Sequence, residues 1–391
     1  MAPVVIPGIE NLRLNPPEEL KSQRLGLLAN PASVGLDFTH SVEIINNTFP
    51  GRLTALFSPQ HGFYAEKQDN MIESSHGVHA ELNIPIYSLY SHTRIPTEEM
   101  FQDIDILLVD IQDVGTRVYT FIYTISYCME MAARMGKQVI VLDRPNPIGG
   151  VHVEGNILEP NFSSFVGRFP IPMRHGLTVG EISSLFNWKF GLGCDLSVIP
   201  MKGWTRGMYW QDTGLPWIPP SPNLPTPQSC LVYPGQVIFE GTNLSEGRGT
   251  TLPFEQFGAP YVNAGKLIEK ASGRLKGVHL RAVNFEPTSG KWQNQVCRGV
   301  HIHILDVDQY QPYFSSLLLL QIIQKLHPEE FEFKKPPYEY EYDRLPMDLI
   351  LGSKILRQKI QNQKKLEDLE AQWQEELLTF QSLSQEIHLY D

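Results

Sequence analysis

The sequence predicts an α/β protein with a doubly wound parallel sheet and a smaller α/β C-terminal domain. Short apolar runs rich in β-branched residues alternate with helix-like stretches over the first half of the chain. The runs are almost continuously apolar, which is typical of strands buried on both faces of a parallel sheet. The length of 391 residues suits two domains, at roughly 150 residues per domain as a prior.

Five apolar runs of the first half are expected to form strands: residues 24–29, 52–57, 84–89, 104–109 and 138–142. Helices are expected between them, at residues 41–47, 97–101 and 119–135. Thr97 followed by Glu98 and Glu99 is typical of a helix start, because acidic side chains favour the first turn. Alternation of this kind favours a sheet whose strands are joined by right-handed helical crossovers.

Gly, Pro, Asn and Ser recur every few residues after Gly149. Strands are expected there at residues 196–201, 278–284 and 300–305, and helices at 178–190, 313–326 and 354–385. Thr178 and Glu181 have the spacing of a capping box. The polar last helix favours a solvated outer face over a packed cap or a partner-binding element. Proline is densest near residues 226–228, which predicts domains at residues 1–227 and 228–391.

The charge balance excludes some classes of partner. The chain has 43 acidic residues and 32 Lys and Arg, giving a net charge of −11, so nucleic acid and anionic membranes are not expected to bind.

No apolar run approaches the roughly 18 residues of a membrane span. The start of the chain has no signal-peptide pattern, and the four cysteines form no CxxC pair. A cytoplasmic protein with reduced, buried thiols is therefore expected.

Polar, turn-forming clusters follow four of the expected strands. Because the carboxyl ends of parallel strands meet at one edge of the sheet, we expect these clusters to form a binding site there, with caps and turns as the alternative for any one residue. The clusters begin at Asn30, Ser58, Asp110 and Asp143.

A second polar concentration lies at residues 240–251, where glycines alternate with Glu240, Asn243, Glu246 and Arg248. Glycine lets the backbone approach a ligand closely, and the charged side chains supply strong hydrogen bonds. Such a loop suits the dense hydroxyl groups of a sugar, although a structural omega loop has the same composition.

Several sharper motifs are absent from the sequence. There is no GxGxxG after the first strand, no phosphate-binding GxxxxGK[ST] and no GxSxG nucleophile elbow. His76 with His79, and His301 with His303, have neither HExxH spacing nor an evident third ligand. No cofactor and no metal are expected.

The same clusters resemble a known family, the exo-acting β-N-acetylmuramidases of peptidoglycan recycling. This family was formerly classified as a domain of unknown function. The matching runs are NP at 30–31, SPQHGF at 58–63, DIQDVGTRVYT at 110–120, DRPNP at 143–147, VEG at 153–155, SFVG at 164–167, RHG at 174–176, PSPN at 220–223 and the loop at 240–251. The resemblance implies a Rossmann-like N-terminal domain, a smaller C-terminal domain and a cleft between them. It also implies release of N-acetylmuramic acid from the non-reducing end of muropeptide-derived disaccharides.

The chain departs from the family pattern at one position. The family's usual run is Pro-Glu-His-Gly, and the resemblance implies that this glutamate is the catalytic carboxylate, whereas the chain has Gln60 followed by His61. Glutamine neither exchanges a proton as a general acid or base nor acts as a carboxylate nucleophile.

Glycosidases ordinarily need two carboxylates beside the scissile bond. Asp113 is the preferred remaining acid or base, tuned by Arg117 or His61, and its alternative is a helix N-cap before Gly115. Glu66 is a second candidate to replace the missing carboxylate. Asp110, Glu73 and Glu154 are further carboxylates expected near this edge.

Arg144, Arg174 and Arg248 are candidates to bind the lactyl carboxylate of muramic acid, because arginine pairs with carboxylates bidentately. The sequence does not choose among them. The full set expected to bind substrate is Asn30, Asp110, Arg117, Tyr119, Asp143, Arg144, Asn146, Glu154, Arg174, His175, Asn223, Glu240, Asn243, Glu246 and Arg248.

Three functions remain open from the sequence. The first is an exo-N-acetylmuramidase that acts on a small carbohydrate substrate, either a muropeptide or a disaccharide. The second is a non-hydrolytic homologue that binds or senses muropeptides, because Gln60 has removed catalysis. The third is a different sugar-processing activity that uses another pair of acids.

Overall fold

The main sheet of the protein is a twisted, mostly parallel layer in the N-terminal lobe. The structure is a computed structural model, and it describes residues 4–68 and 71–391. Within these residues the sheet has seven strands in the order β3-β4-β2-β1-β5-β6-β7, and only β3 is antiparallel to its neighbour. The strands are β1 (Leu25–Ala29), β2 (Leu53–Ser58), β3 (Gly77–Val78), β4 (Pro85–Ser88), β5 (Ile106–Asp110), β6 (Gln138–Leu142) and β7 (Asp195–Ile199).

Both faces of this sheet are covered by helices, which confirms the doubly wound α/β fold. Alternate residues of β1 pack on opposite sides, so that Leu27 contacts the cluster of α1 and α2 while Leu28 contacts that of α3 and α4. The order of the six parallel strands is that of a Rossmann-like sheet, with the switch point between β1 and β5. The helices are α1 (Gly8–Leu14), α2 (Ser41–Thr48), α3 (Glu98–Phe101), α4 (Phe121–Met135) and α5 (Val179–Lys189).

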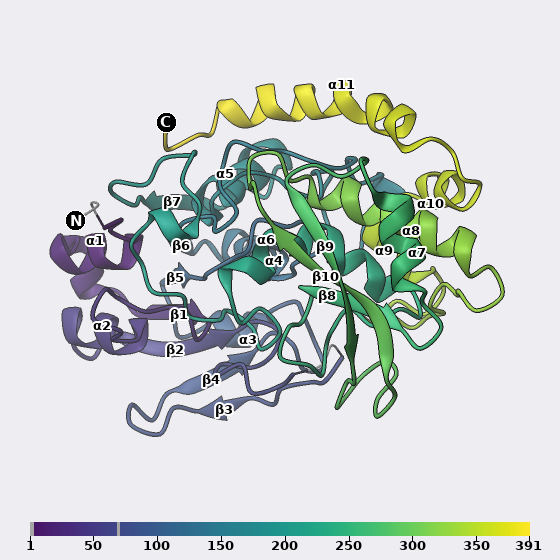
Figure 1. The fold of residues 1–391 in the computed structure, drawn as a ribbon. Coiled ribbons are helices and arrows are strands. Elements are labelled where there is room, and N and C mark those ends of the chain that lie inside the picture. Colours follow the sequence, from purple (N-terminus) through teal and green to yellow (C-terminus); the bar gives the residue numbers. More distant parts are fainter. Residues whose placement is uncertain (1–3, 69–70) are drawn as a thin grey trace.

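The C-terminal lobe packs several helices against a small antiparallel sheet of order β8-β10-β9 (Figure 1). Its strands are β8 (Gln256–Ala259), β9 (Val278–Phe285) and β10 (Cys297–Ile304). Its helices are α6 (Pro227–Gln236), α7 (Ala264–Ala271), α8 (Pro312–Leu326), α9 (Pro346–Leu351), α10 (Lys354–Gln361) and α11 (Leu366–Gln385). Short 3-10 helices lie at Glu18–Ser22, Pro160–Phe162, Trp210–Asp212 and Val237–Gly241.

The six strands predicted for the N-terminal lobe all form, with ends within two residues of the predicted ends. The capping box is also confirmed, because the Thr178 hydroxyl accepts from the Glu181 amide and the Glu181 carboxylate accepts from the Thr178 amide. The proline-rich stretch near residue 226 is the start of α6, where Pro227 occupies the first turn and the Thr226 side chain caps the Ser229 amide.

A single hydrophobic core joins the two lobes. Leu28 and Val109 of the main sheet belong to the same contiguous cluster of buried side chains as Val300 and Leu318 of the C-terminal lobe. A large apolar contact of this kind opposes free movement of one lobe against the other. The division at residues 227 and 228 therefore separates parts that share a core, and as a domain boundary it stays a prediction.

The single long helix predicted over residues 354–385 is wrong. The chain forms two helices, α10 and α11, because Gln363 adopts a left-handed conformation with φ of 54° and reverses the chain. The outer face of α11 is solvated, as expected, but the helix also packs an apolar inner face and crosses the molecule over both lobes (Figure 1). Its buried side chains recur every three or four residues, the spacing of one helix face: Leu366, Leu369, Trp373, Leu377, Phe380 and Ser384.

Arg117 connects the lobes through a fully buried guanidinium group. Its side chain is 0% exposed and donates to the backbone carbonyls of Asn156 and Ile171, at 2.8 and 3.1 Å, and of Ile350 and Leu351, both at 3.0 Å. The last two carbonyls end α9, where the helix itself leaves them without partners. A cation at this helix end is also favoured by the helix dipole. Arg117, expected to bind substrate, is therefore surrounded by the protein interior.

Among the described residues no helix has the length and apolar character needed to cross a membrane.

Replacing Arg117 by lysine is expected to lower the free energy of unfolding by about 3 kcal/mol or more. A single ammonium group does not reach carbonyls on three segments. The Ile171 and Leu351 carbonyls keep donors in the Leu158 amide and the Asn156 side chain, but a buried carbonyl of Asn156 or Ile350 left without a donor is costly. Urea unfolding at pH 7 measures the change. The matched control is Arg134→Lys, because Arg134 is 66% exposed in its ion pair with Glu98 and should change stability by less than about 0.5 kcal/mol. Equal losses in the two variants would contradict this role.

Candidate active site

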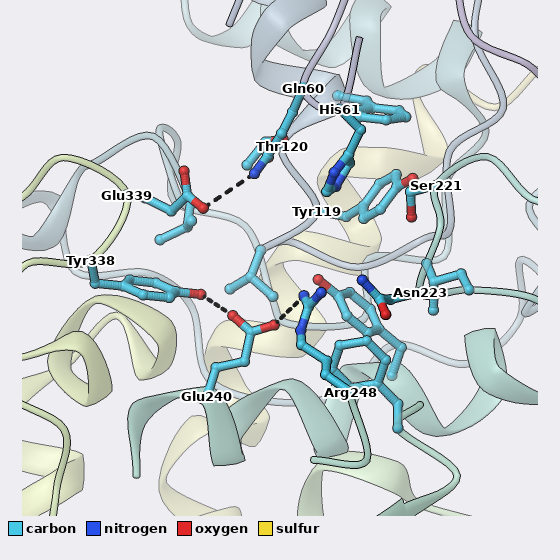
Figure 2. A pocket seen from close by; sticks show the side chains of 16 residues that line it. Gln60, His61, Tyr119, Thr120, Ser221, Asn223, Glu240, Arg248, Tyr338 and Glu339 are labelled. Atoms are coloured by element: carbon cyan, nitrogen blue, oxygen red, sulfur yellow. Dashed lines mark hydrogen bonds and ion pairs between the residues drawn. The ribbon is translucent and has the colours of Figure 1, made fainter. Parts of the chain in front are cut away.

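A polar cavity lies where the carboxyl ends of β2 and β5 face the C-terminal lobe (Figure 2). The cavity itself is small, with a volume of about 30 Å³, and has room for no more than a few water molecules in this conformation. Both lobes line it, with Gln60, His61, Val118, Tyr119, Thr120, Phe121, Val166, Ser221, Asn223 and Leu224 from one and Tyr233, Glu240, Arg248, Phe254, Tyr338 and Glu339 from the other.

Gln60 enters the cavity from the sharp turn that follows β2. His61 and Gly62 both have left-handed backbones, with φ of 78° and 87°, so the chain reverses directly after Gln60. The Gln60 amide is oriented at both ends: its oxygen accepts from the Thr120 hydroxyl at 2.8 Å, and its nitrogen donates to Glu339 Oε1 at 3.2 Å. The residue that departs from the family pattern is thus in direct contact with a buried carboxylate.

Glu339 is the main functional candidate that no pattern in the sequence indicated. It is 6% exposed, and its second oxygen accepts from the Tyr90 hydroxyl at 2.6 Å. Tyr338 and Glu341 pair through both backbone hydrogen bonds, so Glu339 and Tyr340 are the central residues of a tight turn. Their φ values of 46° and 64° are those of a turn that normally carries Asn-Gly, and a left-handed conformation costs roughly 1–2 kcal/mol per ordinary residue.

Burial raises the pKa of Glu339 to about 7, against an ordinary value of 4.5. The nearby charge of Glu240 acts in the same direction, whereas the hydrogen bonds from Tyr90 and Gln60 and the charge of Arg94 oppose it. The burial effect dominates because the two hydrogen-bond donors are neutral and compensate only part of the lost hydration. Glu339 therefore exchanges a proton near neutral pH.

Glu240 is a second buried carboxylate in the cavity, held in a different environment. Its two oxygens accept from Arg248 Nη2 at 2.8 Å and from the Tyr338 hydroxyl at 2.7 Å (Figure 2). Burial by itself would raise the pKa of Glu240, but the charge and hydrogen bond of Arg248 outweigh it and lower the pKa below its usual value. Glu240 is therefore ionised at neutral pH.

Ion pairs hold the loop at residues 240–251 in its conformation. Arg248 Nε lies 3.3 Å from Glu246, and Lys291 Nζ donates to the other Glu246 oxygen at 2.9 Å. Asn243 points elsewhere, accepting from Tyr261 and donating to the Glu330 carbonyl. Of the loop residues expected to bind substrate, Glu240 and Arg248 line the cavity, whereas Asn243 and Glu246 support it from outside.

His61 also lines the cavity, as a neutral imidazole. Burial lowers its pKa to about 4. Its Nδ1 lies 2.7 Å from the Lys67 carbonyl, which only a ring N–H satisfies, so Nε2 carries the lone pair. Two further residues predicted to bind substrate, Tyr119 and Asn223, also line the cavity. The Asn223 side chain donates to the Gln68 carbonyl.

The switch point between β1 and β5 is closed by the protein's own hydrogen bonds. Asp110 accepts from Arg144 and Ser41, and Asn30 donates to the Gln112 carbonyl at 3.1 Å. Asp143 accepts from Thr178, Gly180 and Tyr390, and Asn146 donates to the Leu177 carbonyl. The cavity is lined by none of these five residues that were predicted to bind substrate: Asn30, Asp110, Asp143, Arg144 and Asn146. Their role as sugar ligands stays a prediction.

Asp113 and His175 lie in the interior, outside the cavity lining. Asp113 Oδ2 accepts from the Gly115 amide at 2.7 Å, the contact of a turn cap, and lies 3.8 Å from His175 Nε2. Burial raises the pKa of Asp113 to about 7 and lowers that of His175 to about 3. The helix N-cap expected here is wrong, because the next helix, α4, begins only at Phe121, and Asp113 caps a turn instead. An acid–base role for Asp113 stays a prediction.

The remaining candidates are dispersed. Glu154 and Arg174 line a separate cavity with Asp308 and Tyr310, and burial raises the pKa of Glu154 to about 7. Glu66 lies behind the turn at Gly62, where a side chain in place of the glycine hydrogen would bring its Cβ within 2.8 Å of the Glu66 carboxylate. Over residues 4–68 and 71–391 no group of three His, Cys, Asp or Glu side chains is placed to hold a metal ion.

The raised pKa of Glu339 predicts a pH-dependent stability difference for Glu339→Gln. The folded-state pKa exceeds the unfolded value, so ionisation penalises folding: the penalty is absent below about pH 4 and complete above about pH 7. From pH 4.5 to pH 8 the native protein should lose up to about 3 kcal/mol relative to the variant, whose amide does not titrate. Urea unfolding at both pH values measures this.

The control for that experiment is Asp343→Asn, which changes an exposed carboxylate of the same loop. It should follow the native protein at both pH values. A gap between native protein and Glu339→Gln that does not change with pH would contradict the prediction.

Comparisons with known proteins agree with this architecture. The chain matches the models of the N-terminal domain of exo-beta-N-acetylmuramidase NamZ over residues 25–228 and of its C-terminal domain over residues 231–390. It is 42% identical over 389 residues to the peptidoglycan beta-N-acetylmuramidase NamZ of Bacillus subtilis, covering 99% of this chain and 92% of the relative.

Two crystal structures of DUF1343 family proteins from Bacteroides fragilis have the same fold. One has a TM-score of 0.89 at 35% identity and covers 99% of each chain. The other has a TM-score of 0.77 at 29% identity and covers 100% of this chain and 99% of its own. The two family domains supply opposite walls of the cavity that holds Gln60, Glu240 and Glu339. The chain therefore belongs to the exo-β-N-acetylmuramidase NamZ family.

Proposed function

We propose that the protein is a glycoside hydrolase that releases N-acetylmuramic acid from the non-reducing end of peptidoglycan fragments. The observation that carries the proposal is the pair of buried carboxylates, Glu240 and Glu339, which line one cavity from the C-terminal lobe. Glycosidases need two carboxyl groups in distinct protonation states beside the scissile bond. The Bacillus subtilis relative is named for this activity, and the family of the chain is named for it as well.

The lining of the cavity, rather than its volume of about 30 Å³, suits a terminal sugar. Its polar groups converge from both lobes, and Tyr119, Tyr233 and Phe254 add aromatic rings against which the apolar face of a sugar ring packs. The proposed substrates are small carbohydrates, either muropeptides or disaccharides. The four reduced cysteines, Cys128, Cys194, Cys230 and Cys297, support action in the cytoplasm.

Arg248 is the proposed ligand of the lactyl carboxylate of muramic acid. Of the three arginines that the sequence left open, it is the one that lines this cavity, whereas Arg144 and Arg174 line other cavities. Its Nη1 makes no hydrogen bond with the described residues. Because Nη2 and Nε already contact Glu240 and Glu246, Nη1 is the atom proposed to donate to the lactyl carboxylate.

A second candidate function is muropeptide binding without hydrolysis. The observation that favours it is the Gln60 amide, which is held by Thr120 and Glu339 at the position where the resemblance implies a catalytic glutamate. An amide neither donates nor accepts the catalytic proton.

A hydrolysis assay on a chromogenic β-N-acetylmuramide decides between these functions. The native chain should release the chromophore, because Glu240 and Glu339 supply both carboxylates. The comparison variant is Gln60→Glu, which introduces the family residue. Activity in the native protein contradicts the binding-only function. If neither form hydrolyses the substrate while N-acetylmuramic acid binds in calorimetry, the hydrolase function is wrong, and absence of binding as well contradicts both functions.

A further inference from the structure

The position of the Glu339 carboxyl group is set by three independent features of the structure. Its backbone occupies the strained left-handed turn with Tyr340, its oxygens are held by Tyr90 and Gln60, and its side chain lines the same cavity as Glu240 (Figure 2). Strained residues of this kind concentrate at functional sites, because packing alone favours a relaxed turn.

We infer that Glu339 is the proton donor to the glycosidic oxygen, and that Glu240 is the ionised carboxylate that stabilises the positive charge on the sugar. This inference rests on the proposed function and assigns the roles of its two carboxylates. It makes Gln60 a positioning residue, whose amide orients Glu339 without adding a second negative charge beside it.

The two carboxylates have opposite electrostatic environments. Glu240 pairs with the cation of Arg248, whereas Glu339 meets neutral hydrogen-bond donors in a buried position. Two titratable groups whose environments separate their pKa values are the pattern of an acid and its ionised partner. The titratable and charged side chains that surround Glu339 are Tyr90, Arg94, Tyr233, Glu240, Tyr338 and Tyr340.

The proposed step conserves protons and electrons. The carboxylic acid of Glu339 gives its proton to the glycosidic oxygen while the bond from that oxygen to C1 breaks, and the leaving sugar departs as an alcohol. The electron pair of the broken bond goes with the oxygen, and the charge left on C1 and the ring oxygen is stabilised by the Glu240 carboxylate. Water then adds to C1, and its proton passes to the Glu339 carboxylate, which restores the acid.

The test compares two substrates of Glu339→Gln. One is a β-linked disaccharide with N-acetylmuramic acid at the non-reducing end, whose leaving sugar needs a proton. The other is 4-nitrophenyl β-N-acetylmuramide, whose leaving group departs without one. Loss of the acid should lower kcat/KM for the disaccharide by about 100-fold or more. For the nitrophenyl substrate, the factor by which kcat/KM falls should be at least about ten times smaller. KM should change little, and the matched control Asp343→Asn should equal the native protein.

A second variant keeps the carboxyl group and moves its pKa. For the native protein, kcat/KM should fall as the pH rises above about 7, because the acid must be protonated. Tyr90→Phe removes a hydroxyl that donates to Glu339 and so favours ionisation. The basic limb of the pH profile should therefore shift upward by about one unit. The matched control is Tyr340→Phe, which also removes a hydroxyl near Glu339 but leaves both hydrogen bonds to Glu339 in place. Its pH profile should stay closer to that of the native protein.

The outcomes separate the inference from the proposed function. Equal losses on the two substrates, full activity of Glu339→Gln, or an unshifted pH profile of Tyr90→Phe would overturn the role of Glu339 while leaving hydrolysis intact. A native protein that hydrolyses neither substrate overturns the inference and the proposed function together. If Glu339→Gln fails to fold, as thermal unfolding would show, the Tyr90→Phe profile decides.

Discussion

The structure depends on one buried cation, Arg117, and on the four backbone carbonyls that surround it. Its guanidinium group ties the loops that contain Asn156 and Ile171 to the end of α9. Arg117 lies three residues before Thr120, which orients Gln60, and α9 begins a few residues after Glu339. Fixing these two points relative to each other therefore positions the opposite walls of the cavity.

Buried charged groups of the same types serve two different purposes in this fold. At the switch point of the sheet, Asp110 and Arg144 form an ion pair with each other. In the cavity, Glu240 is likewise neutralised by Arg248, but Glu339 is bonded to neutral groups. The difference follows from the cost of burying charge: a paired carboxylate stays ionised, whereas one held by neutral donors retains a usable proton.

The arrangement around Glu339 lowers the stability of the fold and provides a carboxyl group that can exchange a proton. A buried carboxylate whose two hydrogen-bond donors are neutral opposes folding above neutral pH, and two left-handed residues in sequence, Glu339 and Tyr340, add backbone strain. The shared core that includes Leu28 and Leu318, together with the long contact of α11 across both lobes, supplies the packing that holds this segment in place. Catalytic groups are commonly supported in this way by a stable scaffold.

The sequence by itself determined the doubly wound sheet, the capped start of α5 and the polar strand ends, because apolar periodicity and capping are local properties. It also marked Gln60 and the loop of Glu240 as two separate polar concentrations, and the family resemblance implied a cleft between the domains that contain them. The tertiary structure alone decided which polar side chains share a cavity, since Gln60 and Glu339 are 279 positions apart and no local pattern marks their contact. The left-handed Glu339 likewise has no signature in sequence, because its conformation is imposed by the turn and by its partners across the cavity.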